Sequence, residues 1–226
     1  MKARLEHITW LALSGAQASF ACGTDTARRY ARGFSPILGF SDVAQADFAA
    51  LLPYCASGEQ FYCDGWSGPV PAAWQLDAES SMFKMLWEGP LPDAPDAPLA
   101  LLPLGPQHAR QALALAELTR PGPFGLRTIE LGQYLGCFDG ERLIAMAGER
   151  MFSHPLREIS GVCTDPAYQG RGLARALMLA LIRQQMLRAE TPFLHVMREN
   201  VSAHQLYTRM GFRSVAESVV RVLSLR

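Results

Sequence analysis

The sequence carries no excess of charge of either sign. Its 226 residues include 21 Lys and Arg against 21 Asp and Glu, so the formal net charge is zero. Lysine is almost absent, with only Lys2 and Lys84, and the other basic residues are arginines. Because no positive field covers the whole molecule, we expect neither a nucleic acid nor a membrane as partner. A local anion site is compatible with this balance.

Cysteine pairs and long apolar runs are also missing. The five cysteines, at positions 22, 55, 63, 137 and 163, contain no C-x-x-C spacing. This argues against a disulfide framework and a zinc site, so we expect no metal and a cytoplasmic location. The apolar stretch from Ile8 to Leu13 is too short for a secretory leader, and no run is long enough to cross a bilayer. With 49% hydrophobic residues, the composition is typical of a globular protein with a core.

The most informative segment is an apolar run followed by a loop with two glycines. The run ends at the turn signal Asp165-Pro166, and Gly170 and Gly172 stand where an amphipathic helix begins. Such a loop binds anions, because the first helical N–H groups lack partners and glycine leaves space for a phosphate. The spacing differs from the G-x-G-x-x-G and P-loop patterns. The segment therefore predicts a nucleotide-like ligand outside the usual nucleotide-binding folds.

Two segments together resemble the GCN5-related N-acetyltransferase (GNAT) superfamily. The first, Gln169-x-x-Gly172-x-Ala174, is similar to the acyl-CoA loop of these enzymes. The second, residues 200–212, is similar to their Asn-x-x-Ala-x-x-Leu-Tyr-x-x-x-Gly-Phe helix. The first match alone is weak, but the two segments at this separation are together specific.

Further segments narrow the resemblance to the FR47-like branch of the superfamily. They include residues 119–124, 145–150, 158–164 and 192–196. The match covers roughly residues 99–224, whereas residues 1–90 match only in scattered pieces. The resemblance implies an acyltransferase of the α/β (α+β) class with the GNAT fold, a mixed sheet whose parallel strands splay apart between flanking helices.

A Pro-rich and acidic stretch divides the chain. Residues 91–98 suit an extended linker better than a helix or strand, so we place a boundary there. Residues 99–226 would form the catalytic domain. Tandem arrangements in the superfamily imply that residues 1–90 are a degenerate GNAT-like half, although no clear internal repeat is visible.

Hydrophobic periodicity and turn signals give the expected elements. In the first part we expect helices over residues 26–33 and 42–52 and strands over 60–64 and 82–87. In the second part we expect strands over residues 99–104, 134–138, 143–151, 159–163, 193–197 and 215–223. The helices of that part are expected over residues 106–118, 172–188 and 202–210.

The resemblance implies acetyl-CoA as the acyl donor and suggests which residues hold it. The pantetheine arm would bond to the main chain of one strand as if it were an added strand. The implied donor-binding residues are Val162, Cys163, Thr164, Gln169, Gly170, Arg171, Gly172, Leu173, Ala174, Arg175, Asn200, Ala203 and Tyr207. Arg171 and Arg175 are equally compatible with solvated surface arginines, and a helix cap alone explains Asn200.

Acetyl transfer to an amine needs a proton acceptor and a proton for the leaving thiolate. By resemblance, Tyr207 is the general acid, since a phenol of high pKa can reprotonate a thiolate. For the base, Glu158 is one candidate, acting directly or through water, and His195 is the rival. Glu149 is a third, expected to be exposed, and a free amine would need no strong base. Cys163 is disfavoured as a covalent nucleophile, because a Cys in an apolar strand usually packs as a small hydrophobe.

The function predicted is N-acetyl transfer from acetyl-CoA to a primary amine, by direct attack in a ternary complex. The alternative is a non-catalytic acyl-CoA-binding sensor or interaction module. The acceptor, left open, is a small-molecule amine, an amino acid or a protein amine. The loop at residues 119–124 is where such enzymes usually keep acceptor-binding elements. A bare edge strand near the C-terminus leaves monomer and homodimer open.

Overall fold

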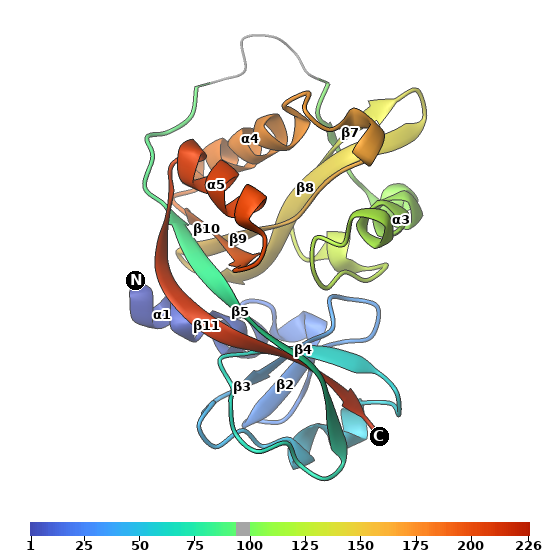
Figure 1. Cartoon of the computed structure of the whole chain (residues 1–226), viewed down its shortest axis with the longest axis vertical. Coiled ribbons are helices and arrows are strands. Elements are labelled where there is room, and N and C mark those ends of the chain that lie inside the picture. The colour runs from blue at the N-terminus through green and yellow to red at the C-terminus, as the bar shows by residue number, and fades with distance from the viewer. Residues whose placement is uncertain (94–99) are drawn as a thin grey trace.

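A computed structural model describes residues 1–93 and 100–226 (Figure 1). In these ranges eleven strands form one sheet, in the order β1-β2-β3-β4-β11-β5-β10-β9-β8-β7-β6. The strands are β1 (Ala21–Gly23), β2 (Ala27–Tyr30), β3 (Ile37–Phe40), β4 (Gln60–Asp64), β5 (Trp74–Trp87), β6 (Leu102–Pro103), β7 (Tyr134–Asp139), β8 (Arg142–Ser153), β9 (Leu156–Thr164), β10 (Thr191–Met197) and β11 (Phe212–Leu225). The helices are α1 (Lys2–Glu6), α2 (Ile8–Ser14), α3 (Ala109–Thr119), α4 (Leu173–Leu187) and α5 (Val201–Met210).

The sheet is mixed and is flanked by helices, as the expected fold class requires. Most neighbouring strands are antiparallel, but β9 and β10 run parallel, as do β3 and β4. No helix of the described residues is long and apolar enough to span a membrane.

Apolar stripes hold the helices against both faces of the sheet. Leu177, Met178 and Leu181 of α4 are fully buried in one core cluster, which also contains Leu194 and Val196 of β10. A second cluster joins α1 and α2 to residues on β8 and β10. The helices α4 and α5 therefore cover one face near β10, and the N-terminal helices cover the opposite face.

One long strand from the first part of the chain completes the sheet of the second part. Strand β5 lies between β10 and β11 and pairs antiparallel with both. In Figure 1 the paired β5 and β11 run together from the upper to the lower part of the molecule. The sheet is thus continuous through residues from both sides of the expected linker. The division into two domains at residues 91–98 stays a prediction, and residues 94–98 of that stretch lie outside the described residues.

The parallel pair β9 and β10 separates along its length. Pairing is limited to Leu156–Glu158 with Thr191–Phe193, and the two strands then diverge. Gly161 on β9 has a φ of 61°, a left-handed value that glycine tolerates, and the register of β9 against β8 shifts on both sides of Gly148. The expected splay is therefore present, and these irregularities lie in β9 at and beyond the point where the pairing with β10 ends.

Most expected elements of the second part are confirmed within a few residues. The exception is the strand expected over 99–104, of which only Leu102–Pro103 forms a strand and residue 99 is not described. In the first part β4 is confirmed, and β5 begins eight residues earlier than expected.

Both helices expected in the first part are wrong. Residues 27–30 form β2, because Arg29 is buried by an ion pair with Glu59 and a stack on Phe61. Residues 42–48 form bends and turns, and only a 3-10 helix follows at Ala49–Tyr54. Tertiary contacts override local helix propensity in such short segments.

Candidate active site

A cavity of about 600 Å³ lies where β9 and β10 diverge. Ser160 to Val162 of β9 line it on one side and His195 of β10 on the other. Three residues of the α5 region also line it, and these are Asn200, Ala203 and Tyr207. The loop Thr119–Pro123 and several residues of the first part of the chain complete the wall. The cavity thus gathers residues that are more than 100 positions apart in the sequence.

The two rival bases, Glu158 and His195, are bonded to each other. His195 Nδ1 lies 2.7 Å from Glu158 Oε1, and both side chains are largely buried. The opposite ring nitrogen of His195, Nε2, is buried without a hydrogen-bond partner among the described residues. Because Glu158 is a carboxylate acceptor, it favours the tautomer with the proton on Nδ1. The Nε2 atom is then left as a proton acceptor.

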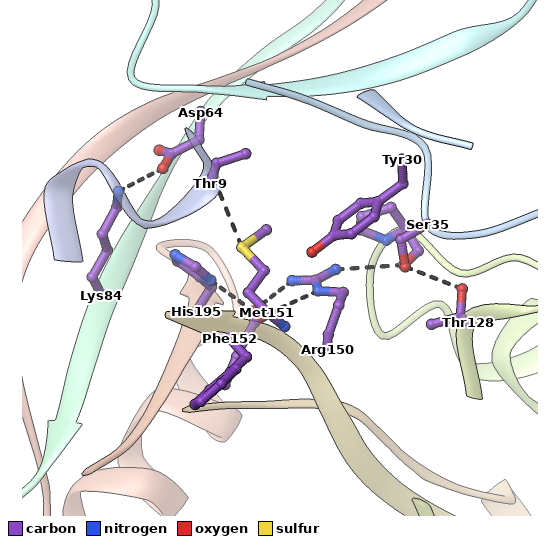
Figure 2. Close-up of polar contacts among 12 residues, drawn as sticks. Thr9, Tyr30, Ser35, Asp64, Lys84, Thr128, Arg150, Met151, Phe152 and His195 are labelled. Atoms are coloured by element: carbon purple, nitrogen blue, oxygen red, sulfur yellow. Dashed lines mark hydrogen bonds and ion pairs between the residues drawn. The ribbon is translucent and has the colours of Figure 1, made fainter. Parts of the chain in front are cut away.

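Arg150 fixes the Glu158 carboxylate from the other side. Its Nε and Nη2 atoms donate to the two Glu158 oxygens at 2.9 and 2.6 Å, and the Met151 N–H donates a further bond. Figure 2 shows the His195 ring and the Arg150 guanidinium on either side of the Met151 side chain. Burial alone would raise the pKa of Glu158, but the Arg150 guanidinium and the bonds from Arg150 and His195 outweigh it and lower the pKa well below its ordinary value. Glu158 is therefore an ionised group with every oxygen already engaged.

Tyr207 lies on α5 and is packed inside the same cavity wall. Its ring stacks edge-on against Phe212, with 6.2 Å between ring centroids. Burial, with a smaller effect from Cys163, raises the pKa of Tyr207 to about 12. The phenol is therefore protonated at neutral pH and is available as a hydrogen-bond donor.

The glycine loop lies between β9 and α4. Gly172 is the N-cap of α4, and both Gly170 and Gly172 have left-handed φ values near 77° and 76°. A Cβ added at either would meet no atom of residues 1–93 or 100–226 within 4 Å, so open space lies above the loop. Arg171 rests over the Tyr168 ring, and Arg175 is exposed. Leu173 is the first residue of α4 and its side chain is buried. Gln169 precedes the two glycines in the sequence, and Ala174 follows Leu173.

Among the described residues, the strand segment Val162–Thr164 has one edge without a pairing strand. Its residues pair with β8 at Cys163 and Thr164, whereas β10 has already diverged on the other side. Val162 lines the cavity, but Cys163 is buried in a separate cluster with Tyr134 and Met146. Burial raises the pKa of the Cys163 thiol to about 12. The thiol is thus a buried, protonated group, as the sequence indicated.

Asn200 caps α5 as expected. Its Oδ1 accepts a hydrogen bond from the Ala203 N–H at 3.1 Å, and the residue also borders the cavity. Glu149 differs from expectation, since it is buried and bonded to Arg188 and Gln185 rather than exposed. It does not border the cavity in the described part of the chain.

Two contributions to the site were not foreseen. Arg150 was noticed only as part of a family-like segment, and nothing local indicates that it binds Glu158 eight residues later. The cavity residues from the first part of the chain, including Thr9, Tyr62 and Asp64, belong to no recognised motif. Tyr62 and Asp64 reach the site because β4 pairs with β11 in the same sheet, and Thr9 of α2 reaches it where it bonds Met151 of β8.

The chain resembles known acetyltransferases in sequence and in fold. The model of the FR47-like protein family matches residues 134–222. A solved structure from Novosphingobium aromaticivorans, described as an acetyltransferase of the GNAT family, is 32% identical, with 98% of each chain covered and a TM-score of 0.88. A GCN5-related N-acetyltransferase from Kribbella flavida has a TM-score of 0.60 at 12% identity, covering 100% of this chain and 95% of that one, and shows the fold alone.

One curated relative is the N-alpha-acetyltransferase RimI of Mycobacterium tuberculosis. It is 35% identical over 85 residues, which is 36% of this chain and 52% of the relative. This chain therefore spans about half the length of that relative.

These similarities define the class of protein. The chain belongs to the GNAT superfamily and is by class an acyltransferase. Within the superfamily it falls in the FR47-like branch.

Proposed function

We propose that this protein transfers the acetyl group of acetyl-CoA to a primary amine, in the cytoplasm, by direct attack within a ternary complex. The observation that carries the proposal is the arrangement of His195 and Tyr207 around one cavity at the splay. His195 offers a ring nitrogen that has no hydrogen-bond partner in the part of the chain that the structure describes, and Tyr207 offers a protonated phenol. A proton acceptor and a proton donor are the two groups that this reaction requires.

Acetyl-CoA would lie along the free edge of β9 with its pyrophosphate at the glycine loop. The main chain of Val162, Cys163 and Thr164 would bond the pantetheine arm by strand addition. The N–H groups at the start of α4 and the open space over Gly170 and Gly172 suit a phosphate. Asn200 and Ala203, at the start of α5, would border the arm.

His195 would accept the proton of the amine. Attack forms the N–C bond and breaks the C–S bond, and the proton lost by nitrogen passes to His195 Nε2. Glu158, fixed by Arg150, would hold Nδ1–H and stabilise the imidazolium. We assign Glu158 as a positioning residue rather than the base, since its oxygens already accept four hydrogen bonds.

Tyr207 would donate its proton to the departing thiolate. A group with a pKa of about 12 is protonated at neutral pH, so it can hydrogen-bond the sulfur as negative charge develops there and supply the proton that the departing thiolate takes up. The resulting phenolate would then regain a proton from solvent as products leave. Cys163 is buried and does not line the cavity in the described part of the chain, so it has no covalent role in this scheme.

A two-part experiment tests the proposal. Calorimetric titration with acetyl-CoA should show saturable binding that Gly172→Glu weakens by at least about tenfold, since a carboxylate in the loop repels the pyrophosphate. Gly140→Glu is the matched control, because Gly140 has a similar left-handed φ of 57° and open space but lies in the β7–β8 turn. Equal weakening by both variants would argue against the loop as the phosphate site.

The second part measures transfer to a panel of amines. His195→Ala should lower kcat by about 10²–10⁴-fold with an unchanged acetyl-CoA Kd, the usual contribution of general-base catalysis. If the wild-type protein binds acetyl-CoA but transfers nothing to any amine, the enzyme proposal fails and a CoA-binding sensor takes its place.

A further inference from the structure

We infer that the acceptor is a small amine whose non-reacting part is apolar and uncharged, and that strands of the first part of the chain form its binding floor. The inference rests on the proposed function, because it places the acceptor amine at His195 Nε2. It concerns the side of the cavity that lies beyond the splay, away from α5.

The floor of this side is one face of the continuous sheet. Val220 of β11 pairs with Asp64 on β4 and with Ser80 on β5. Two positions along, Val222 pairs with Tyr62 and Ala78. Residues paired across strands, and residues two apart on a strand, share a face. All six of these residues line the cavity. Four of the six, Tyr62, Ala78, Val220 and Val222, present apolar or aromatic surface, and the other two are Ser80 and the ion-paired Asp64, so most of the floor suits an apolar body.

The charges that border this floor are already neutralised within the protein. Asp64 is bound by Lys84 at 2.5 Å and accepts a further bond from Ser218. Figure 2 shows the Lys84–Asp64 pair beside Thr9 of α2, which also lines the cavity. Glu79 pairs with Arg221 at 2.6 Å.

Two charged residues of the cavity wall have no ion pair in the described part of the chain, Arg120 and Glu199. Both are exposed to solvent, and neither belongs to the six floor residues. A second charged group on the acceptor would therefore lose its hydration when it binds at the floor. The floor offers it no unpaired group of opposite charge in exchange. Burying an unpaired charge in this way is costly, so charged bodies should be rejected.

The size of the cavity favours a small molecule over a folded protein. His195 Nε2 is buried, so the reacting nitrogen must enter the cavity to reach it. A volume of about 600 Å³ falls within the usual range for small-molecule sites, and part of it would hold the acyl arm. A flat protein surface could not bring an amine to that depth.

The test is a matched series of amines of equal length given to the full-length protein with acetyl-CoA. We expect n-hexylamine to exceed 1,6-diaminohexane and 6-aminohexanoate in kcat/KM by at least about tenfold, because each competitor carries a second charge. It should exceed an N-terminal Ala peptide by a similar factor. Equal or reversed preference for a charged amine, or preference for the peptide, would overturn this inference while leaving acetyl transfer itself intact. Absence of transfer to every amine would instead overturn the proposed function and this inference with it.

Two neighbouring serines on β5 supply the matched variants. Ser80→Phe fills the floor, whereas Ser81→Phe places the same ring on the opposite face, where Ser81 bonds Glu217. We expect Ser80→Phe to raise KM for hexylamine at least about tenfold, as binding area is lost, with the acetyl-CoA Kd unchanged. Ser81→Phe should alter neither value. Equal effects of the two variants on KM would refute the assignment of the floor, and the amine series on the wild-type protein tests the inference even if Ser80→Phe does not fold.

Discussion

The buried pair of Glu158 and Arg150 allows a sharp test of how the site is held together. Glu158→Gln keeps the shape of the side chain but leaves the Arg150 guanidinium, which is almost wholly buried, without a counter-charge. Removing one partner of a buried pair costs about 3–5 kcal/mol of the free energy of unfolding. For a chain of this size that corresponds to a fall in Tm of about 6–20 °C.

The control is an ion pair of nearly the same geometry on the surface. Arg213 donates to both oxygens of Glu88 at 2.7 and 2.5 Å. The side chains of Arg213 and Glu88 are 62% and 47% exposed, whereas those of Arg150 and Glu158 are 8% and 1% exposed. Glu88→Gln should cause no measurable loss, since solvent screens exposed pairs. Urea unfolding followed by tryptophan fluorescence measures both variants. Equal losses, or a loss below about 1 kcal/mol for Glu158→Gln, would refute the assignment of a buried, ionised carboxylate.

The same pair sets a dependence on pH. The pKa of Glu158 is lower in the folded protein than in the unfolded chain, where it is about 4.3. Its stabilisation is therefore complete above that value and declines as the pH falls below it. The difference in stability between wild type and Glu158→Gln should shrink on acidification from pH 6 to pH 3, and a constant difference would contradict the lowered pKa.

Two further substitutions separate the roles of the remaining candidates. Tyr207→Phe should lower kcat by about 10²-fold or more while leaving the acetyl-CoA Kd unchanged, because it removes only the acid. Since the pKa of Tyr207 is about 12, wild-type kcat should show no loss from ionisation of this tyrosine up to about pH 10. A loss of kcat at lower pH that is absent in Tyr207→Phe would contradict the burial of the phenol. Cys163→Ala should cost about 1 kcal/mol of stability, the scale of one small buried group, with kcat retained. Loss of acetyl transfer in a folded Cys163→Ala protein would instead support a covalent intermediate on Cys163.

The second part of the chain was predictable because its signals are local. Asn200 before α5, Gly211 after it and the Asp139-Gly140 turn each mark a boundary through their own backbone chemistry. The first part gave weaker signals. Residues 27–30 read as helical, but the burial of Arg29 by Glu59, thirty residues away, decides their strand conformation. The start of β5 shows little alternation because residues 75–79 are all exposed, and its partner residues on β11 lie more than 140 residues further along the chain.

The site was predictable by residue type but not by geometry. Glu158 and His195 were separate candidates, since sequence gives no distance between strands that pair only in the folded sheet. The hydrogen bond between Glu158 and His195 makes the two alternative candidates parts of one site. The floor formed by Tyr62, Ser80 and Val220 had no sequence signal at all, because it depends on which strand enters the middle of the sheet.

The position of β5 also has a consequence for how the chain folds. During synthesis β5 is made early, yet both of its neighbours, β10 and β11, are made more than 100 residues later. Until then both edges of a fourteen-residue strand lack these partners. Contacts so distant in sequence form slowly, and unpaired edges invite association with other chains. The position of β5 between β10 and β11, which builds the cavity, therefore makes completion of the sheet one of the last events of folding. The nascent chain is most prone to aggregation before that point.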